Sequence, residues 1–365
     1  VDLLMTGAGA RLTVAGELAP RTDAPDVDLV VGLTGSSFAE LRPLLRTALP
    51  PWGPYGGAAR LRISKWGYEV EDLRFAVGES VLEGRGALNT ARQPKPLLDL
   101  ALAASSIQLD DFPLADWSPF DAGAPADAAV TKGLAQQLQE GADAAGAQVQ
   151  ALLDPALLAA NDANVRLQVR EVRSGRDRLG RGEARAKVAD GALEIDPVVV
   201  EMEGGAARLA VSYRPRGDDV ETRTRVDVKR FDYGVIARRI KPDTDLAGTF
   251  SLDLDVAGRS PRLARTVARG SGHIDLAVWP ERLHAGVFDL WATNVFLAVL
   301  PALNADVTRV NCAIREFDLA DGVLRSRRVL IDTTNTRAEG SAVVDLPGNA
   351  IEARLVPQAK VPQFF

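Results

Sequence analysis

The sequence has few of the residues that build disulfides, catalytic sites and membrane spans. One cysteine, Cys312, occurs in 365 residues, so no disulfide can form within the chain, and we interpret it as a small buried residue. Only two histidines are present, His273 and His284. Polar residues interrupt every long apolar run, which argues against a transmembrane helix of about 20 residues. Both ends fall inside repeat-like sequence, so we expect a soluble piece of a longer protein.

The charge balance argues against nucleic acid as a partner. The chain carries 43 basic and 49 acidic residues, for a net charge of −6 at pH 7. The two signs are interspersed, and neither forms the large basic surface that a polyanion would require.

The chain does contain a unit that recurs imperfectly. The segment 190–201 aligns without a gap with 321–332, a third copy places Val70 over Leu324, and the chain opens within a fourth copy at 10–16. Repeats of this kind indicate stacked units that share one continuous apolar surface. Such a surface favours binding or conducting over a single catalytic pocket.

The repeated units have the alternation of strands. From Val220 to Lys229 every second residue is Val or Thr and the others are charged, and 250–256, 165–169 and 208–213 repeat the pattern. Asp190-Gly191 and Asp321-Gly322 are typical of tight turns. We predict a mainly β fold in which elongated antiparallel meander repeats form a curved sheet or groove, polar outside and apolar inside.

Three regions are expected. Residues 1–112 are β-repeat units with a short helix near 37–48, and 113–163 form a loop and an Ala-rich helical insertion that packs on the outside of the sheet. Residues 164–365 form a C-terminal β domain. Within it an apolar helix is predicted near 287–303, with one stripe made by Phe288, Trp291, Val295, Val299 and Leu303. This helix either plugs the end of the apolar trough or contacts acyl chains at a membrane interface.

The region from Arg230 to Phe365 resembles the C-terminal region of the AsmA-like family. The motifs that carry the resemblance follow one another in order. They are Gly270–Leu276, Val287–Trp291, Val310–Ala313, Phe317–Gly322 and Ile331–Thr334. The upstream units, which contain Gly16-Glu17-Leu18 and Gly86-Ala87-Leu88, resemble the family's repeats more loosely.

The resemblance implies a function and a location. Members are similar to bridge-like lipid transfer proteins of the Gram-negative envelope, anchored in the inner membrane by an N-terminal helix and projecting into the periplasm. Their apolar β-groove is implicated in outer-membrane assembly and phospholipid movement. The implied partners are phospholipid acyl chains, the inner membrane through a helix absent from this chain, and other envelope proteins. No cofactor and no enzymatic activity are implied.

Alternation in the strands selects the residues that would line such a groove. The candidates are Leu209, Val211, Val226, Val228, Phe250, Leu252, Leu254 and Val256. The same pattern also suits a dry sandwich whose inner faces pack on each other. In that case the protein would be a β-rich periplasmic scaffold or binding module that meets a protein or glycan.

Enzymatic interpretations have little support in the sequence. His273 and Asp275 alternate with apolar residues, so they share the polar face of one strand and could bind a metal or transfer a proton. Solvated strand residues are far commoner, and no motif flanks Cys312 as a nucleophile. We therefore expect no catalytic, cofactor-binding or metal-binding residues.

Overall fold

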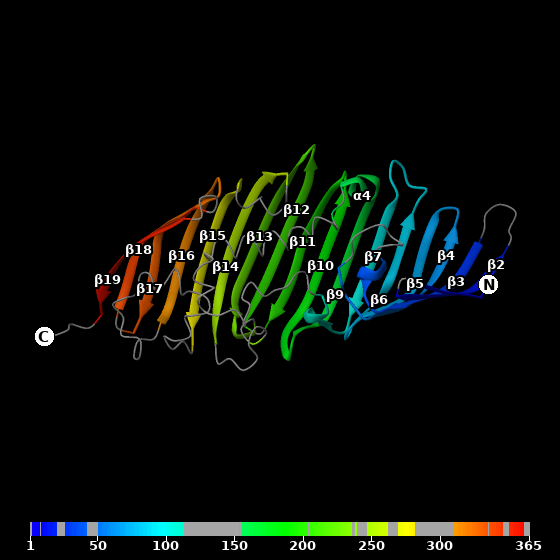
Figure 1. The fold of residues 1–365 in the computed structure, drawn as a ribbon, viewed down its shortest axis with the longest axis horizontal. Coiled ribbons are helices and arrows are strands. Elements are labelled where there is room, and N and C mark those ends of the chain that lie inside the picture. Colours follow the sequence, from blue (N-terminus) through cyan, green and yellow to red (C-terminus); the bar gives the residue numbers. More distant parts are fainter. Residues whose placement is uncertain are drawn as a thin grey trace. The chain divides into compact units, whose positions relative to one another are not determined.

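The computed structural model describes most of the chain in thirteen stretches. They are residues 2–7, 9–19, 26–41, 50–112, 153, 155–202, 204–235, 238, 247–261, 269–281, 310–334, 336–345 and 350–360. These residues form nineteen strands and a few short helices, which confirms the mainly β prediction (Figure 1). The fold divides into two compact units, β1 to β11 with most of β12 in the first and most of β13 with β14 to β19 in the second.

The first unit is a meander of long strands. Its elements are β1 Asp2–Gly7, β2 Ala10–Ala19, β3 Asp26–Gly35, β4 Tyr55–Ser64, β5 Gly67–Val77, β6 Ser80–Asn89, β7 Leu97–Ala104, β8 Ile107–Gln108, β9 Asp162–Ser174, β10 Asp177–Ala189, β11 Ala192–Met202 and β12 Gly205–Arg216. Antiparallel pairing runs from β1 to β7 and from β9 to β11. β9 lies parallel to β7 and β8 and joins the two runs into one sheet.

The second unit is also built of antiparallel strands. Its elements are β13 Asp219–Asp232, β14 Gly248–Ser260, β15 Ser271–Pro280, β16 Val310–Ala320, β17 Val323–Thr333, β18 Thr336–Asp345 and β19 Ala350–Ala359. Each strand from β14 to β19 is antiparallel to the next. Their alternating sequences explain this arrangement, because a period of two places apolar residues on one face and polar residues on the other.

The repeats of the sequence correspond to equivalent strands. The segments aligned with one another are β5, β11 and β17. Where β5 pairs with β4, the register shifts between Glu71 and Arg74 of β5. Where β17 pairs with β16, the register shifts between Arg325 and Arg328 of β17. The two shifts fall at matching positions of the alignment. The repeat therefore preserves a bulge as well as an alternation.

The turns that join the strands have the backbone geometry that their sequences require. In the β10–β11 turn Asp190 and Gly191 have φ of 54° and 76°, and in the β16–β17 turn Asp321 and Gly322 have φ of 49° and 77°. Both are left-handed conformations, which Asp tolerates and Gly favours. The predicted tight turns are confirmed.

The predicted helices are described only in part. One 3₁₀ turn, η1 Phe38–Leu41, lies within the predicted helix near 37–48, whereas 42–49 fall outside the described residues. Of the insertion 113–163, the structure describes Leu153, the short helix α4 Pro155–Ala160 and the start of β9. The predicted apolar helix near 287–303, with Phe288, Trp291, Val295, Val299 and Leu303, lies outside the described residues. No helix that the structure describes is long and apolar enough to cross a bilayer.

Candidate functional site

One face of the first unit is apolar from strand to strand, and we call it the inner face. The register aligns one residue from each of nine strands into a row across the sheet. The row is Gly16, Leu29, Leu61, Val70, Gly86, Leu100, Val165, Ala186 and Ile195. Every member is partly exposed and none is buried. The inner face is thus a continuous apolar surface that the protein itself covers incompletely.

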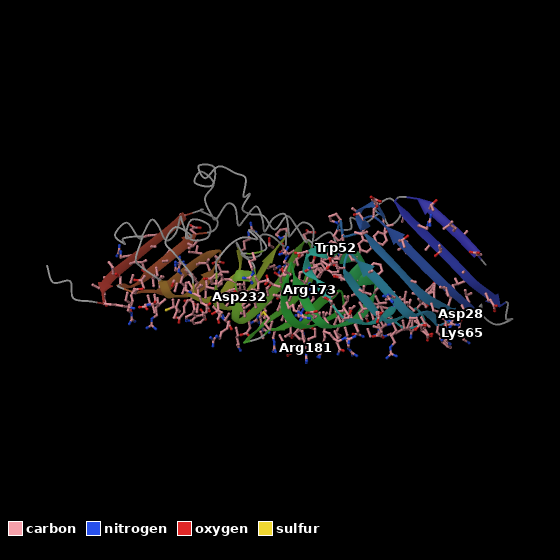
Figure 2. The ribbon with its side chains drawn as sticks, turned by 90° about the horizontal axis from the view of Figure 1, so that it is seen from below. Asp28, Trp52, Lys65, Arg173, Arg181 and Asp232 are labelled. Atoms are coloured by element: carbon pink, nitrogen blue, oxygen red, sulfur yellow. The ribbon has the colours of Figure 1, made fainter. Side chains whose placement is uncertain are left out.

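The adjacent row, one residue along each strand, faces the other way and is polar. It consists of Glu17, Asp28, Arg62, Glu69, Ala87, Asp99, Asn164, Lys187 and Glu194. Figure 2 shows Asp28 and Arg181 on the side of the sheet opposite to Trp52. The contrast between the two rows follows from the period of two in the sequence.

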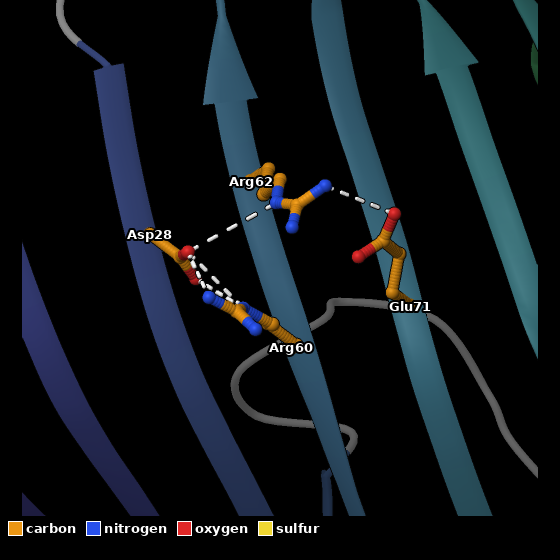
Figure 3. A network of polar contacts seen from close by, with 4 residues as sticks. All are labelled: Asp28, Arg60, Arg62 and Glu71. Carbon is orange, nitrogen blue, oxygen red and sulfur yellow. Dashed lines mark hydrogen bonds and ion pairs between the residues drawn. The ribbon is translucent and has the colours of Figure 1, made fainter.

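We call the polar face opposite the inner face the outer face. Ion pairs on it connect neighbouring strands. Arg60 on β4 donates to both carboxylate oxygens of Asp28 on β3, with Nε–Oδ1 at 2.8 Å and Nη2–Oδ2 at 2.5 Å. Arg62 lies 3.9 Å from the same carboxylate and donates to Glu71 on β5 at 3.0 Å (Figure 3). The hydrogen bond from Arg60 lowers the pKa of Asp28. Exposed pairs of this kind contribute little stability each.

In the second unit the predicted lining residues of β14 share one face. Phe250, Leu252, Leu254 and Val256 pair with Val278, Leu276, Ile274 and Gly272 of β15. Val256 is 6% exposed and the other three are half-buried, whereas Asp253 between them has a side chain that is 56% exposed. The sides assigned to these residues from the alternation agree with the structure.

The candidates on β12 and β13 show the same alternation. On β13 Val228 is 8% exposed and Val226 is half-buried, while Arg225 beside them is exposed. On β12 Leu209 and Val211 are half-buried and share the parity of Tyr213, which is 1% exposed. Leu209 and Val211 belong to the first unit and Val226 and Val228 to the second. Whether any of them touches lipid stays a prediction.

In the second unit we call the face that carries Leu252 and Leu254 its inner face, and an arginine lies on it. Arg315 on β16 pairs with Leu276 on one side and Val329 on the other, and burial lowers its pKa. Of the described inner-face side chains on β14 to β19, it is the one that carries a charge. Its position follows the period of two along β16, because Phe317 and Leu319 have the same parity and also pair with inner-face residues of β15.

The polar face of the second unit gathers carboxylates without forming a metal site. Asp253, Asp275 and Glu316 lie opposite one another on β14, β15 and β16, and His273 Nε2 lies 2.8 Å from Asp253 Oδ1. No group of three potential metal ligands with suitable geometry occurs within the described ranges. The expectation that His273 and Asp275 are side chains on a polar strand face agrees with this arrangement.

Cys312 is half-buried, not buried as the sequence suggested. It lies opposite Asp332 on the polar side of the β16–β17 pair, next to a bulge at the start of β16. Burial and then the charge of Asp332 raise the pKa of its thiol. A raised pKa disfavours the thiolate, and therefore argues against a nucleophilic role.

An aromatic cluster closes one rim of the first unit, and the sequence did not predict it. Phe38 of η1 stacks on Tyr55 with ring centroids 4.4 Å apart and on Phe75 at 5.7 Å. Trp52 meets Phe112 edge to face at 5.2 Å. These rings pack around buried Leu41 and Val77 at the ends of β3, β4 and β5.

At the same rim a buried serine and a carboxylate form a set of hydrogen bonds, which we call the lock. Ser80, which is fully buried, donates its hydroxyl to Asp111 at 2.6 Å and accepts the backbone N–H of Gln108 at 2.8 Å. Asp111 also accepts the backbone N–H groups of Glu79 and Ser80, at 3.0 and 2.9 Å. We call the rim that bears this lock and the aromatic cluster the closed rim.

Comparison with known proteins gives one informative match. The chain is 22% identical to the AsmA family protein YhjG of Escherichia coli (strain K12) over 354 residues. That alignment covers 92% of this chain and 49% of the relative, so the chain spans about half the relative's length. No protein-family model and no solved structure matches the chain. The match confirms the resemblance to the AsmA-like family that the sequence motifs indicated.

Proposed function

We propose that the inner face of this AsmA-like chain binds phospholipid acyl chains and conducts them between the inner and outer membranes of a Gram-negative envelope, in support of outer-membrane assembly. The role is non-enzymatic. One observation carries the proposal: a nine-strand row of apolar residues, all partly exposed. The periplasmic location, the anchor in the inner membrane and the envelope protein partners come from the family resemblance.

Partial exposure of the inner face favours a lipid-binding face over a dry core. In a sandwich the inner faces interdigitate at a spacing of about 10 Å, and interiors pack as densely as organic crystals. Residues such as Leu61, Leu100 and Val165 would then be buried, yet each is partly exposed. Within the described part of the first unit no second sheet packs on this face. An apolar surface of this extent calls for an apolar occupant.

An acyl chain meets that requirement in both energy and size. Each methylene that leaves water gains about 0.8 kcal/mol. A ten-residue strand is about 33 Å long, whereas one leaflet of a bilayer is about half of the ~30 Å hydrocarbon core. A chain can therefore lie within the width of the inner face, with its polar head group at a rim in contact with water.

Photo-crosslinking at neighbouring residues tests the proposal. A crosslinker at Leu100 or Leu254, on the inner face, should capture phospholipid in cells. The matched controls are Ala101 and Asp253, one residue along the same strands and on the outer face. We expect capture at the inner positions only. Equal capture on both faces, or none at either, contradicts the proposal.

Mass spectrometry of lipid bound after gentle purification supplies the second test. A lipid-conducting face should retain phospholipid, whereas a close-packed interior has no volume for acyl chains. If no phospholipid is present and the inner crosslinkers capture only protein, the chain is a scaffold or binding module with a dry core.

A further inference from the structure

An exposed tryptophan is held in place at the rim of the first unit opposite the closed rim. Trp66 lies at the tip of the β4–β5 hairpin and is 62% exposed. Its backbone carbonyl accepts the N–H groups of Thr90 and Ala91, at 3.0 and 3.4 Å. Its own N–H donates to Ser64 Oγ at 3.2 Å. The ring is therefore presented to solvent by a hydrogen-bonded backbone. We call residues 64–67 and 89–96, which these bonds bring together, the tryptophan rim.

The tryptophan rim is cationic. Lys65 Nζ lies 4.9 Å from the centroid of the Trp66 ring, and Arg92 and Lys95 lie in the adjoining segment. Neither 64–67 nor 89–96 contains an acidic residue. Arg92 donates to Asp162 of β9 at 2.6 Å, an ion pair that ties the segment to the sheet and offsets the charge of Arg92. The excess positive charge of the rim therefore comes from Lys65 and Lys95.

The inner face continues to this rim. Ile63, Tyr68, Leu88 and Leu98 form the row beside it, and Tyr68 is 44% exposed. The opposite ends of the same strands carry the closed rim, where Phe38, Tyr55 and Phe75 cover the face. Of the two rims of β4 to β6, one is sealed by packed rings and the other exposes aromatic rings beside cations.

We propose that the tryptophan rim docks on the head-group layer of a bilayer that contains anionic phospholipid. Tryptophan and tyrosine concentrate at membrane–water interfaces, because their rings are apolar with a polar edge, and lysine and arginine attract anionic head groups. The absence of carboxylates from both segments favours such a surface over a basic protein partner. Docking here would place an edge of the inner face against lipid. This docking proposal goes beyond the proposed function, because a protein can dock on membranes whether or not it carries acyl chains.

Vesicle flotation tests the docking. The parent protein should bind phosphatidylcholine vesicles that contain about 30% phosphatidylglycerol, and bind less to pure phosphatidylcholine. Trp66→Ala should weaken the partition coefficient about tenfold, and Lys65→Glu should weaken it on the anionic vesicles. Trp279→Ala, at an exposed tryptophan on β15 of the second unit, is the matched control and should leave binding unchanged.

Fluorescence supplies a readout that does not depend on the stability of the alanine variant. Brominated phospholipid should quench part of the parent's tryptophan emission, and Trp66→Phe should abolish that part. The proposal is overturned if the parent does not bind vesicles, if Trp66→Ala binds as the parent does, or if Trp279→Ala loses as much. Phospholipid that co-purifies with each variant is measured separately, so a failure of docking and a failure of acyl-chain binding are distinguishable.

Discussion

The Arg223 guanidinium on β13 donates two parallel hydrogen bonds to the Asp255 carboxylate on β14. The Nε–Oδ1 distance is 2.8 Å and the Nη2–Oδ2 distance is 2.6 Å, and Arg225 adds a third bond at 3.2 Å. These bonds, with that from Arg223 the strongest, lower the pKa of Asp255 to about 2. The fork geometry makes this one of the stronger polar contacts between strands of the second unit.

The first prediction is that the ion pair between Arg223 and Asp255 contributes to the free energy of unfolding, and that this contribution is lost in acid. A carboxylate whose pKa is lower in the folded state stabilises the fold above its unfolded pKa, near 3.9. Asp255→Asn should cost about 1 kcal/mol at pH 7, and the difference should vanish as the pH falls from about 4 towards 2. Urea denaturation of parent and variant between pH 2 and 7 measures this. Glu352→Gln, on the exposed strand β19, is the control, and a pH-independent difference for Asp255→Asn would contradict the prediction.

The second prediction is that removing the Asp275 carboxylate stabilises the protein at neutral pH, whereas removing that of Asp255 destabilises it. Burial raises the pKa of Asp275, and the charges of Glu316, Asp253 and Asp318 raise it further, against a lowering by His273. The folded state therefore disfavours the ionised form. The penalty begins as the pH rises past the unfolded pKa and is complete above the folded pKa. Asp275→Asn should stabilise the protein at pH 7 by up to about 1 kcal/mol, because like charges opposite one another in a sheet repel.

Urea midpoints at pH 7 and pH 3 test the prediction on Asp275. The gain should be present at the higher pH and absent at the lower one. As a matched control, Glu339→Gln removes a carboxylate that pairs with Arg337 at 2.5 Å, and it should not stabilise. Equal stabilisation by both variants would point to a general effect of net charge.

The third prediction concerns the lock at the closed rim. Asp111→Ala removes the acceptor of three hydrogen bonds and leaves the Ser80 hydroxyl and N–H without it in a buried position. We expect a loss of about 2–3 kcal/mol in the free energy of unfolding. Asp111→Asn retains one acceptor oxygen and should lose less. Chemical denaturation that ranks the two variants equally would show that the hydrogen bonds to Asp111 contribute little.

The fourth prediction distinguishes a lipid-facing inner face from a close-packed core through the effect of one substitution on the melting temperature. Leu254→Asp places a carboxylate at a half-buried inner position. On a lipid-facing surface it should reduce bound phospholipid several-fold while the melting temperature changes little, since the carboxylate keeps access to water. In a close-packed core the same change would cost several kcal/mol and unfold the unit. Thermal melts together with lipid mass spectrometry decide between the two.

Local alternation was sufficient to assign the faces of individual strands. It placed Asp253 outside and Val256 inside, and the structure exposes the first and buries the second. It also located the turns at Asp190 and Asp321, because Asp-Gly signals positive φ directly. These features depend on neighbours in sequence, so a single strand carries the information.

The closed rim could not be predicted in this way. Phe38, Tyr55 and Phe112 are far apart in the chain, and they meet only because the ends of several strands converge. The bond between Ser80 and Asp111 joins residues 31 positions apart. On β5 an extra residue between Glu71 and Arg74 shifts the register against β4, which reverses the parity that alternation assumes. Long-range convergence and bulges are invisible to a pattern of period two.

The single-layer meander also bears on how such a chain can evolve. Among the described elements, strands make most of their contacts with the strands directly beside them, so the free energy of folding is nearly a sum over adjacent pairs. Adding or deleting a whole hairpin changes that sum by one increment and leaves the other interfaces intact. The number of strands and the length of each strand thus vary independently. Duplication can therefore change the number of strands that contribute to the apolar face without altering the width of that face.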